Sequence, residues 1–203
     1  MKLYYSPGAC SLAPHIAIQE NGVAAELVRV DLKTHKLADG SDYHRINPKG
    51  YVPAIELDDG TKLTEVATLL QYIADRKPGS LAPVFGTLER YKLMEWLNYV
   101  ATEIHKGYGP LWHHPADDVR ASIVDRLHKR YAIVEAQLAK TPFLNGNAFT
   151  VADAYLYAVT RWAPMLKVDL SAFPHVAAWM KRVDERPAVK AAIAAERGVK
   201  QPA

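Results

Sequence analysis

The chain has 203 residues, of which 49% are hydrophobic and 23% are charged. This balance is typical of a globular protein and excludes a mostly disordered chain. Lys and Arg number 25 against 22 Asp and Glu, and the net charge of +3 is too small to indicate a nucleic-acid partner. No apolar run approaches the roughly 18–20 residues that span a bilayer. The N-terminal segment lacks a signal-peptide pattern, so we expect a cytoplasmic protein with no membrane partner.

Residues 1–78 alternate short strand patterns with helical patterns. The sequence predicts strands at 3–5, 26–32, 54–57 and 62–63, and helices at 11–21 and 65–75. Asp58-Asp59-Gly60 is typical of a hairpin turn between the last two strands. The polar residues 33–50 are expected to form a loop with one helical turn.

Residues 79–86 contain two glycines and a proline, which indicates a linker. Beyond it only helical spacing is found, and helices are predicted at 88–112, 117–139, 150–166, 174–184 and 188–197. Thr150 and Asp153 have the spacing of an N-terminal capping box. The sequence therefore predicts an α/β domain over 1–78 and an all-α domain over 87–203.

Cys10 is the single cysteine, so no internal disulfide can form. It follows a strand and a tight turn and precedes a helix, where backbone N–H groups and the helix dipole favour an anion. One expectation is that the pKa of the Cys10 thiol is lowered, so that it forms a reactive thiolate. The alternative is an inert buried thiol, since free cysteines are commonly buried.

Two further sites stand at the start of predicted elements. Val52-Pro53 precedes the third strand, and a cis bond there would turn the Val52 backbone outward, where it could pair with a peptide-like ligand. A trans bond is the commoner case. Glu65 and the Val66 N–H could together hold an α-amino acid head group. The alternative for Glu65 is simple stabilisation of the helix dipole.

Asn98, Thr102 and His105 follow one another at i, i+4 and i+7, which places them on one stripe of an α-helix. The stripe could line a cleft between the two domains, or it could be an ordinary polar boundary. His113 and His114 have no third ligand at a familiar spacing, so no metal site is predicted.

Four segments together resemble the bacterial beta-class glutathione transferases. They are YYSPGACSLAPHIAI, NPKGYVPAIELDDGTKLTEVATLLQYIAD, EWLNYVATEIHKGYGPLW and GNAFTVADAYLYAVTRWA, which cover nearly the whole chain in order. The resemblance implies a thioredoxin-like N-terminal domain, a helical C-terminal domain and a homodimer. It also implies glutathione as co-substrate, no metal, and a role in detoxification.

The resemblance also implies roles for individual residues. Cys10 would lie beside the glutathione sulfur, with His105 as the polar neighbour of the thiol. Val52, with Pro53 in cis, would pair with the cysteinyl part of glutathione, and Glu65 with Val66 would hold the γ-glutamyl head group. Asn98, Thr102 and Glu103, with His105, match the family stretch that approaches glutathione, and Asn98 would reach the partner subunit's site. Tyr5 and Ser11 are weaker candidates beside Cys10. An apolar electrophile is expected against Tyr108, Leu111, Trp112 and Trp162.

His35 departs from the family, which often has a lysine where it meets the glycyl carboxylate. Because histidine is largely neutral at pH 7, glutathione binding is expected to weaken as the pH rises, if His35 has this role. The predicted activity is conjugation of the glutathione thiol to small apolar electrophiles, with thiol-disulfide exchange through Cys10 as a further possibility. The alternatives are a glutathione-dependent reductase or dehalogenase, and a non-catalytic binding or stress protein on the same fold.

Overall fold

The computed structural model describes residues 1–198. Its sheet has five strands in the order β3-β2-β1-β4-β5. The strands are β1 (Lys2–Tyr5), β2 (Glu26–Asp31), β3 (Lys36–Leu37), β4 (Ala54–Glu56) and β5 (Lys62–Thr64). β1 is central because it pairs in parallel with β2 and antiparallel with β4. Side chains alternate along it, so Leu3 and Tyr5 enter the main core while Tyr4 enters a smaller cluster on the other face.

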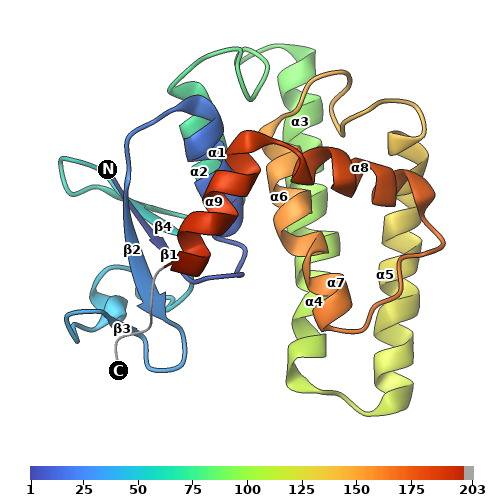
Figure 1. Ribbon diagram of the computed structural model, residues 1–203, viewed down its shortest axis with the longest axis horizontal. Helices are drawn as coiled ribbons and strands as arrows, with labels where there is room; N and C mark the ends of the chain where they lie inside the picture. Colours follow the sequence, from blue (N-terminus) through green and yellow to red (C-terminus); the bar gives the residue numbers. More distant parts are fainter. Residues whose placement is uncertain (199–203) are drawn as a thin grey trace.

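The α-helices lie on one side of this sheet (Figure 1). Those of the first part are α1 (Leu12–Asn21) and α2 (Val66–Asp75), with a short turn η1 (Tyr43–Arg45) in the loop before β4. The second part contains α3 (Leu88–Tyr99), η2 (Val100–His105), α4 (Lys106–Tyr108), η3 (Gly109–His113), α5 (Asp117–Leu138), α6 (Val151–Thr160), α7 (Trp162–Met165), α8 (Pro174–Asp184) and α9 (Pro187–Gly198). The chain is thus a thioredoxin-like domain followed by an all-helical domain, as the sequence predicts.

The two parts share one continuous core. It joins Leu3, Ile16 and Leu69 of the first part to Leu97, Val134 and Leu156 of the second, all buried. Figure 1 shows α1, α2 and α9 between the sheet and the other helices, and α1 packs against α2, α6 and α9. The helix α9, although far from the sheet in sequence, therefore packs with α1 beside the N-terminal sheet.

Two predictions about local structure need correction. The loop at 33–50 contains β3, a strand too short for a period of two to be visible in the sequence. The predicted helix at 88–112 is divided into α3, the π-helix η2, α4 and the 3-10 helix η3. Hydrophobic spacing gives no sign of this change, because Val100, Ile104, Tyr108 and Leu111 remain buried through it.

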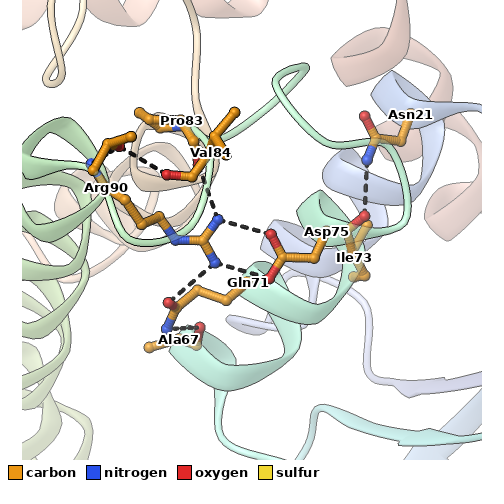
Figure 2. A network of polar contacts seen from close by, with 9 residues as sticks. Asn21, Ala67, Gln71, Ile73, Asp75, Pro83, Val84 and Arg90 are labelled. Atoms are coloured by element: carbon orange, nitrogen blue, oxygen red, sulfur yellow. Dashed lines mark hydrogen bonds and ion pairs between the residues drawn. The ribbon is translucent and has the colours of Figure 1, made fainter.

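Arg90 joins the two parts beside the linker (Figure 2). Its guanidinium is almost fully buried and donates to both carboxylate oxygens of Asp75, at 2.8 and 2.9 Å. It also donates to the side chain of Gln71 and to the carbonyl of Pro83. The paired carboxylate and the extra acceptors compensate for burying the charge, and they fix α2 against the start of α3.

The capping box at the start of α6 forms as the sequence predicts. The carboxylate of Asp153 accepts from the backbone N–H and the hydroxyl of Thr150, each at 2.9 Å. Its other oxygen accepts from the N–H of Leu144 and from Nε1 of Trp179. Because this buried carboxylate joins three segments of the helical part, it is an element of folding rather than of chemistry.

Candidate active site

A cavity of about 640 Å³ lies where the carboxyl end of β1 and the loop before β4 face the helical part. Its volume is in the range of small-molecule sites. Of the predicted site residues, those that line it are Cys10, Val52, Pro53, Glu65, Val66, His105, Trp112 and Trp162. Further lining residues that the sequence did not single out include Lys49, Tyr51, Lys106, Tyr155 and Met165.

The turn that precedes Cys10 is fixed by its own hydrogen bonds. The Ser11 hydroxyl accepts from the Ser6 N–H and donates to the Ser6 carbonyl, both at 3.1 Å. Gly8, at φ 76°, adopts a backbone conformation that favours glycine. Ser11 and Tyr5 are buried behind this turn and do not line the cavity, so their predicted contacts with glutathione would have to be indirect.

Cys10 is in the cavity wall with 8% of its surface exposed. Its thiol donates to the carbonyl of Val52, with 3.4 Å between sulfur and oxygen. Burial raises the pKa of Cys10 to about 12, although backbone N–H groups and Lys106 act in the opposite direction. The expectation of a lowered pKa is therefore wrong, because the cost of desolvating the thiolate exceeds the gain from the helix start.

The Val52-Pro53 peptide bond is cis, as the resemblance implied. Both residues line the cavity beside Cys10. Since Val52 lies outside the strands, its backbone is not part of the sheet ladder, and its carbonyl is the acceptor for the Cys10 thiol. The Val52 backbone is thus at the rim where an extended ligand could pair with it.

Glu65 is the N-cap of α2 and has a positive φ of 72°. Its carboxylate pairs with Nζ of Lys49 at 2.6 Å, and Lys49 also donates to the hydroxyl of Thr64 at 3.0 Å. Both partners are largely exposed, so the pair is open to exchange with a ligand. Val66, the first residue of α2, is buried and can contribute only its backbone.

His105 ends the π-helix η2 and is held between two aromatic rings. Its Nδ1 lies 2.7 Å from the Tyr155 hydroxyl, and its ring is 5.1 Å from that of Trp162, centroid to centroid. Burial lowers the pKa of His105 to about 4, with Lys106 acting in the same direction and Glu65 against it. The imidazole is therefore neutral at pH 7.

Asn98 and Thr102 do not share the cavity with His105. Both are exposed outside it, and Glu103 pairs instead with Arg130 of α5 at 2.8 Å. The predicted stripe assumed an α-helix, whereas each residue of a π-helix turns the chain by a smaller angle. The helix widening accordingly separates His105 from the other two side chains.

The predicted electrophile residues divide into two layers. Trp112 and Trp162 line the cavity in edge contact, with ring centroids 5.8 Å apart. Tyr108 and Leu111 are fully buried behind them and do not line it. The Tyr108 hydroxyl hydrogen-bonds that of Tyr131, so it supports the wall from inside.

His35 lies away from the cavity lining. It has a positive φ of 53°, and its ring is 4.6 Å from that of His44, centroid to centroid. Its Nδ1 is buried and has no hydrogen-bond partner among residues 1–198. The loop before β4 instead contributes a different basic residue, Lys49, to the cavity lining.

A buried network behind the turn was also not predicted. The side chain of Glu196, in α9, accepts from the Gly8 N–H at 3.1 Å and contacts Nδ1 of His15 at 3.2 Å. The Gly8 carbonyl in turn accepts from Nε1 of Trp162 at 2.9 Å. These contacts join residues more than 150 positions apart, which no local sequence pattern reveals.

Known proteins resemble the chain over nearly its whole length. Residues 3–81 match the family model "Glutathione S-transferase, N-terminal domain" and residues 99–187 match "Glutathione S-transferase, C-terminal domain". Glutathione S-transferase GstA of Escherichia coli O157:H7 is 47% identical over 97% of this chain and 98% of its own length.

Solved structures agree with this result. BphK, described as a bacterial GST in a ternary complex, is 48% identical, with a TM-score of 0.94, over 97% of this chain and all of its own. A sphingomonad glutathione S-transferase, solved with glutathione, is 44% identical with a TM-score of 0.92, over 98% of this chain and all of its own.

The chain belongs to the glutathione S-transferase family, and its relatives place it with the bacterial beta class. Within residues 1–198 no cluster of three His, Cys, Asp or Glu side chains could hold a metal ion. In the same part of the chain, no helix is long and apolar enough to cross a membrane.

Proposed function

We propose that this protein binds glutathione in the cavity and conjugates its thiol to small apolar electrophiles. The observation that carries the proposal is the gathering of Cys10, Val52, Glu65 and His105 around one cavity. The beta-class relatives support it, since one of them was solved with glutathione. The same observation counts against a protein that has kept the fold but lost glutathione binding, because Val52, Glu65 and His105 all line one cavity.

The proposed pose runs along the end of the sheet. The Glu65 carboxylate takes the ammonium of the γ-glutamyl group, and the Val66 N–H takes its carboxylate. In the ligand-free protein Lys49 forms an ion pair with Glu65. When glutathione binds, Lys49 is close enough to leave Glu65 and pair with the γ-glutamyl carboxylate instead. The Val52 backbone forms hydrogen bonds with the cysteinyl unit. The hydrogen bond from the Cys10 thiol to the Val52 carbonyl is then broken.

The proposed chemistry is nucleophilic attack by the glutathione thiolate. On binding, the thiol releases its proton to solvent, and His105 with the N–H groups at the start of α1 stabilises the negative sulfur. The sulfur then adds to the electrophile, or displaces a leaving group such as halide. Trp112 and Trp162 offer an apolar wall for the electrophile.

Isothermal calorimetry with glutathione and a conjugation assay with a chlorinated nitroarene test this function. We expect binding that is lost in Glu65→Ala, together with thioether formation and release of chloride. Glutathione binding without any conjugation would favour the non-catalytic alternative. Release of halide with oxidation of glutathione, in place of thioether formation, would favour a reductive dehalogenase.

A second activity, thiol-disulfide exchange, is favoured by the place of Cys10 in the cavity wall. The Cys10 thiolate would attack a glutathione mixed disulfide and expel the other thiol, and a second glutathione would release oxidised glutathione. In Cys10→Ala we expect conjugation to persist while exchange is lost. Unchanged exchange in that variant would remove Cys10 from this activity.

We also propose a homodimer, a cytoplasmic location and a boundary at residues 79–86 between a glutathione-binding domain and a helical domain. The dimer is supported by Asn98 and Thr102, which are exposed outside the cavity and match the family stretch that approaches glutathione. Light scattering of the purified protein tests the dimer. The lone thiol suits a reducing compartment, and cell fractionation tests the location.

A further inference from the structure

Tyr155 lies between the helical core and the cavity, and it contacts His105 directly. It belongs to α6 and is 2% exposed, yet it lines the cavity. Its hydroxyl is 2.7 Å from Nδ1 of His105, and the two rings are 5.7 Å apart at 82°, edge to face. A buried contact this short restricts both the orientation and the protonation of the imidazole.

Both partners are neutral in this environment. Burial lowers the pKa of His105 to about 4, and burial raises the pKa of Tyr155 well above that of an ordinary phenol. The charged or titratable groups that face the pair are Lys106, Glu65 and Cys10. A neutral imidazole has one N–H, and a neutral phenol has one O–H, so two arrangements of the protons are possible.

The surroundings of the Tyr155 hydroxyl distinguish the two arrangements. Within the described residues, its oxygen has no hydrogen-bond partner other than Nδ1 of His105. If Nδ1 carried the proton, the phenol O–H would be left without a protein acceptor in a buried position, which costs free energy. If the phenol donates to Nδ1, both the phenol O–H and Nδ1 are satisfied, and the proton of the imidazole is on Nε2.

We propose that Tyr155 is a positioning residue that holds His105 with its proton on Nε2, so that this N–H donates to the glutathione sulfur. The role rests on the proposed function, because the sulfur is the ligand atom concerned. No proton passes to His105 in this step: the glutathione thiol loses its proton to water, and the imidazole stabilises the thiolate as a neutral donor.

The matched experiment compares Tyr155→Phe with Tyr157→Phe. Tyr157 lies two residues further along α6 and is also buried, but its hydroxyl donates to Asp184 and it does not line the cavity. Both changes remove one buried hydroxyl, so loss of stability is common to them. Only Tyr155→Phe is expected to alter the chemistry at His105.

With glutathione bound, the thiolate is followed by its ultraviolet absorbance as the pH is raised. In Tyr155→Phe we expect the apparent pKa of bound glutathione to rise by about one unit, which lowers kcat/KM at neutral pH by about tenfold. The KM for glutathione should change little, because the groups that hold its two ends are intact. An unchanged thiolate titration in Tyr155→Phe, or an equal shift in Tyr157→Phe, would overturn the proposal.

Nitrogen NMR of the ligand-free protein gives an independent measurement. With nitrogen-labelled histidine, and with His105→Gln to assign the signal, we expect His105 to carry its proton on Nε2 in wild type. In Tyr155→Phe we expect a mixture of the two tautomers. A proton on Nδ1 in wild type would contradict the role of Tyr155 even if glutathione binds. Absence of glutathione binding with the expected tautomer would instead refute only the proposed function.

Discussion

The carboxylate of Glu196, in the last helix, accepts the backbone N–H of Gly8 in the turn that carries Cys10, at 3.1 Å. The same carboxylate contacts His15, and both side chains are buried. The hydrogen bond therefore connects the C-terminal helix to the cavity wall. The turn is held from behind by a residue 188 positions away.

We expect Glu196→Gln to lower both stability and activity. An amide keeps one acceptor oxygen but loses the charge that strengthens the bond to the Gly8 N–H, so the free energy of unfolding should fall by about 1–3 kcal/mol. Urea unfolding measures this. Displacement of the turn should also reduce kcat/KM by about tenfold. Glu185→Gln, at an exposed position, is the matched control, and equal effects in both variants would contradict the role of Glu196.

Cys10 should alkylate slowly in the folded protein. Because burial raises the pKa of its thiol to about 12, little thiolate is present at pH 7, and the sulfur is also shielded. The rate with iodoacetamide, followed by mass spectrometry, is expected to be at least about tenfold below that of the same chain in urea. Since Cys10 is the single cysteine, the unfolded chain is its own control. Equally fast alkylation of the folded protein near neutral pH would show that the thiol is activated.

His105 should make stability depend on pH. Burial lowers its pKa from 6.5 to about 4 in the folded state, so the unfolded chain binds the proton more tightly. The contribution is fully present above pH 6.5 and is lost as the pH falls towards about 4, with a total of about 3 kcal/mol. Urea unfolding at a series of pH values should show a smaller slope in His105→Gln, while the exposed His113→Gln should retain the wild-type slope.

Lys49 should contribute to glutathione affinity and not to stability. Its ion pair with Glu65 is exposed, so Lys49→Met should change the free energy of unfolding by less than about 1 kcal/mol. If Lys49 exchanges Glu65 for the γ-glutamyl carboxylate, the Kd for glutathione should rise by about tenfold in calorimetry. Lys62→Met removes an exposed lysine of β5 and is the control. The exchange is contradicted if the two variants bind glutathione equally well.

Local patterns in the sequence predicted much of the fold and part of the site. Gly22 ends α1 in a left-handed conformation, and the capping box at Thr150 starts α6, because such signals depend on neighbouring residues alone. Cys10 and Glu65 were found for the same reason, since each stands at the start of a helix. The direction of the Cys10 pKa shift was wrong, because burial depends on the packed structure.

The residues that were missed depend on contacts between distant segments. In the sequence Tyr155 and Tyr157 look alike within a uniformly buried helix, and only their distant partners, His105 and Asp184, distinguish them. In the sequence Lys49 is a polar loop residue and Glu196 is an ordinary helical glutamate. Only the folded structure brings Lys49 to Glu65 and Glu196 to Gly8. The π-helix η2 was missed because hydrophobic spacing tolerates it.

The position of α9 has a consequence for the order in which the protein is made. Synthesis produces the sheet and the Cys10 turn early, whereas the helix that secures this turn comes last in chain order among the described elements. A polypeptide that stops short of residue 187 would contain every cavity-lining residue and yet lack Glu196. The turn that carries Cys10 therefore gains this hydrogen bond only after α9 has been made and has docked.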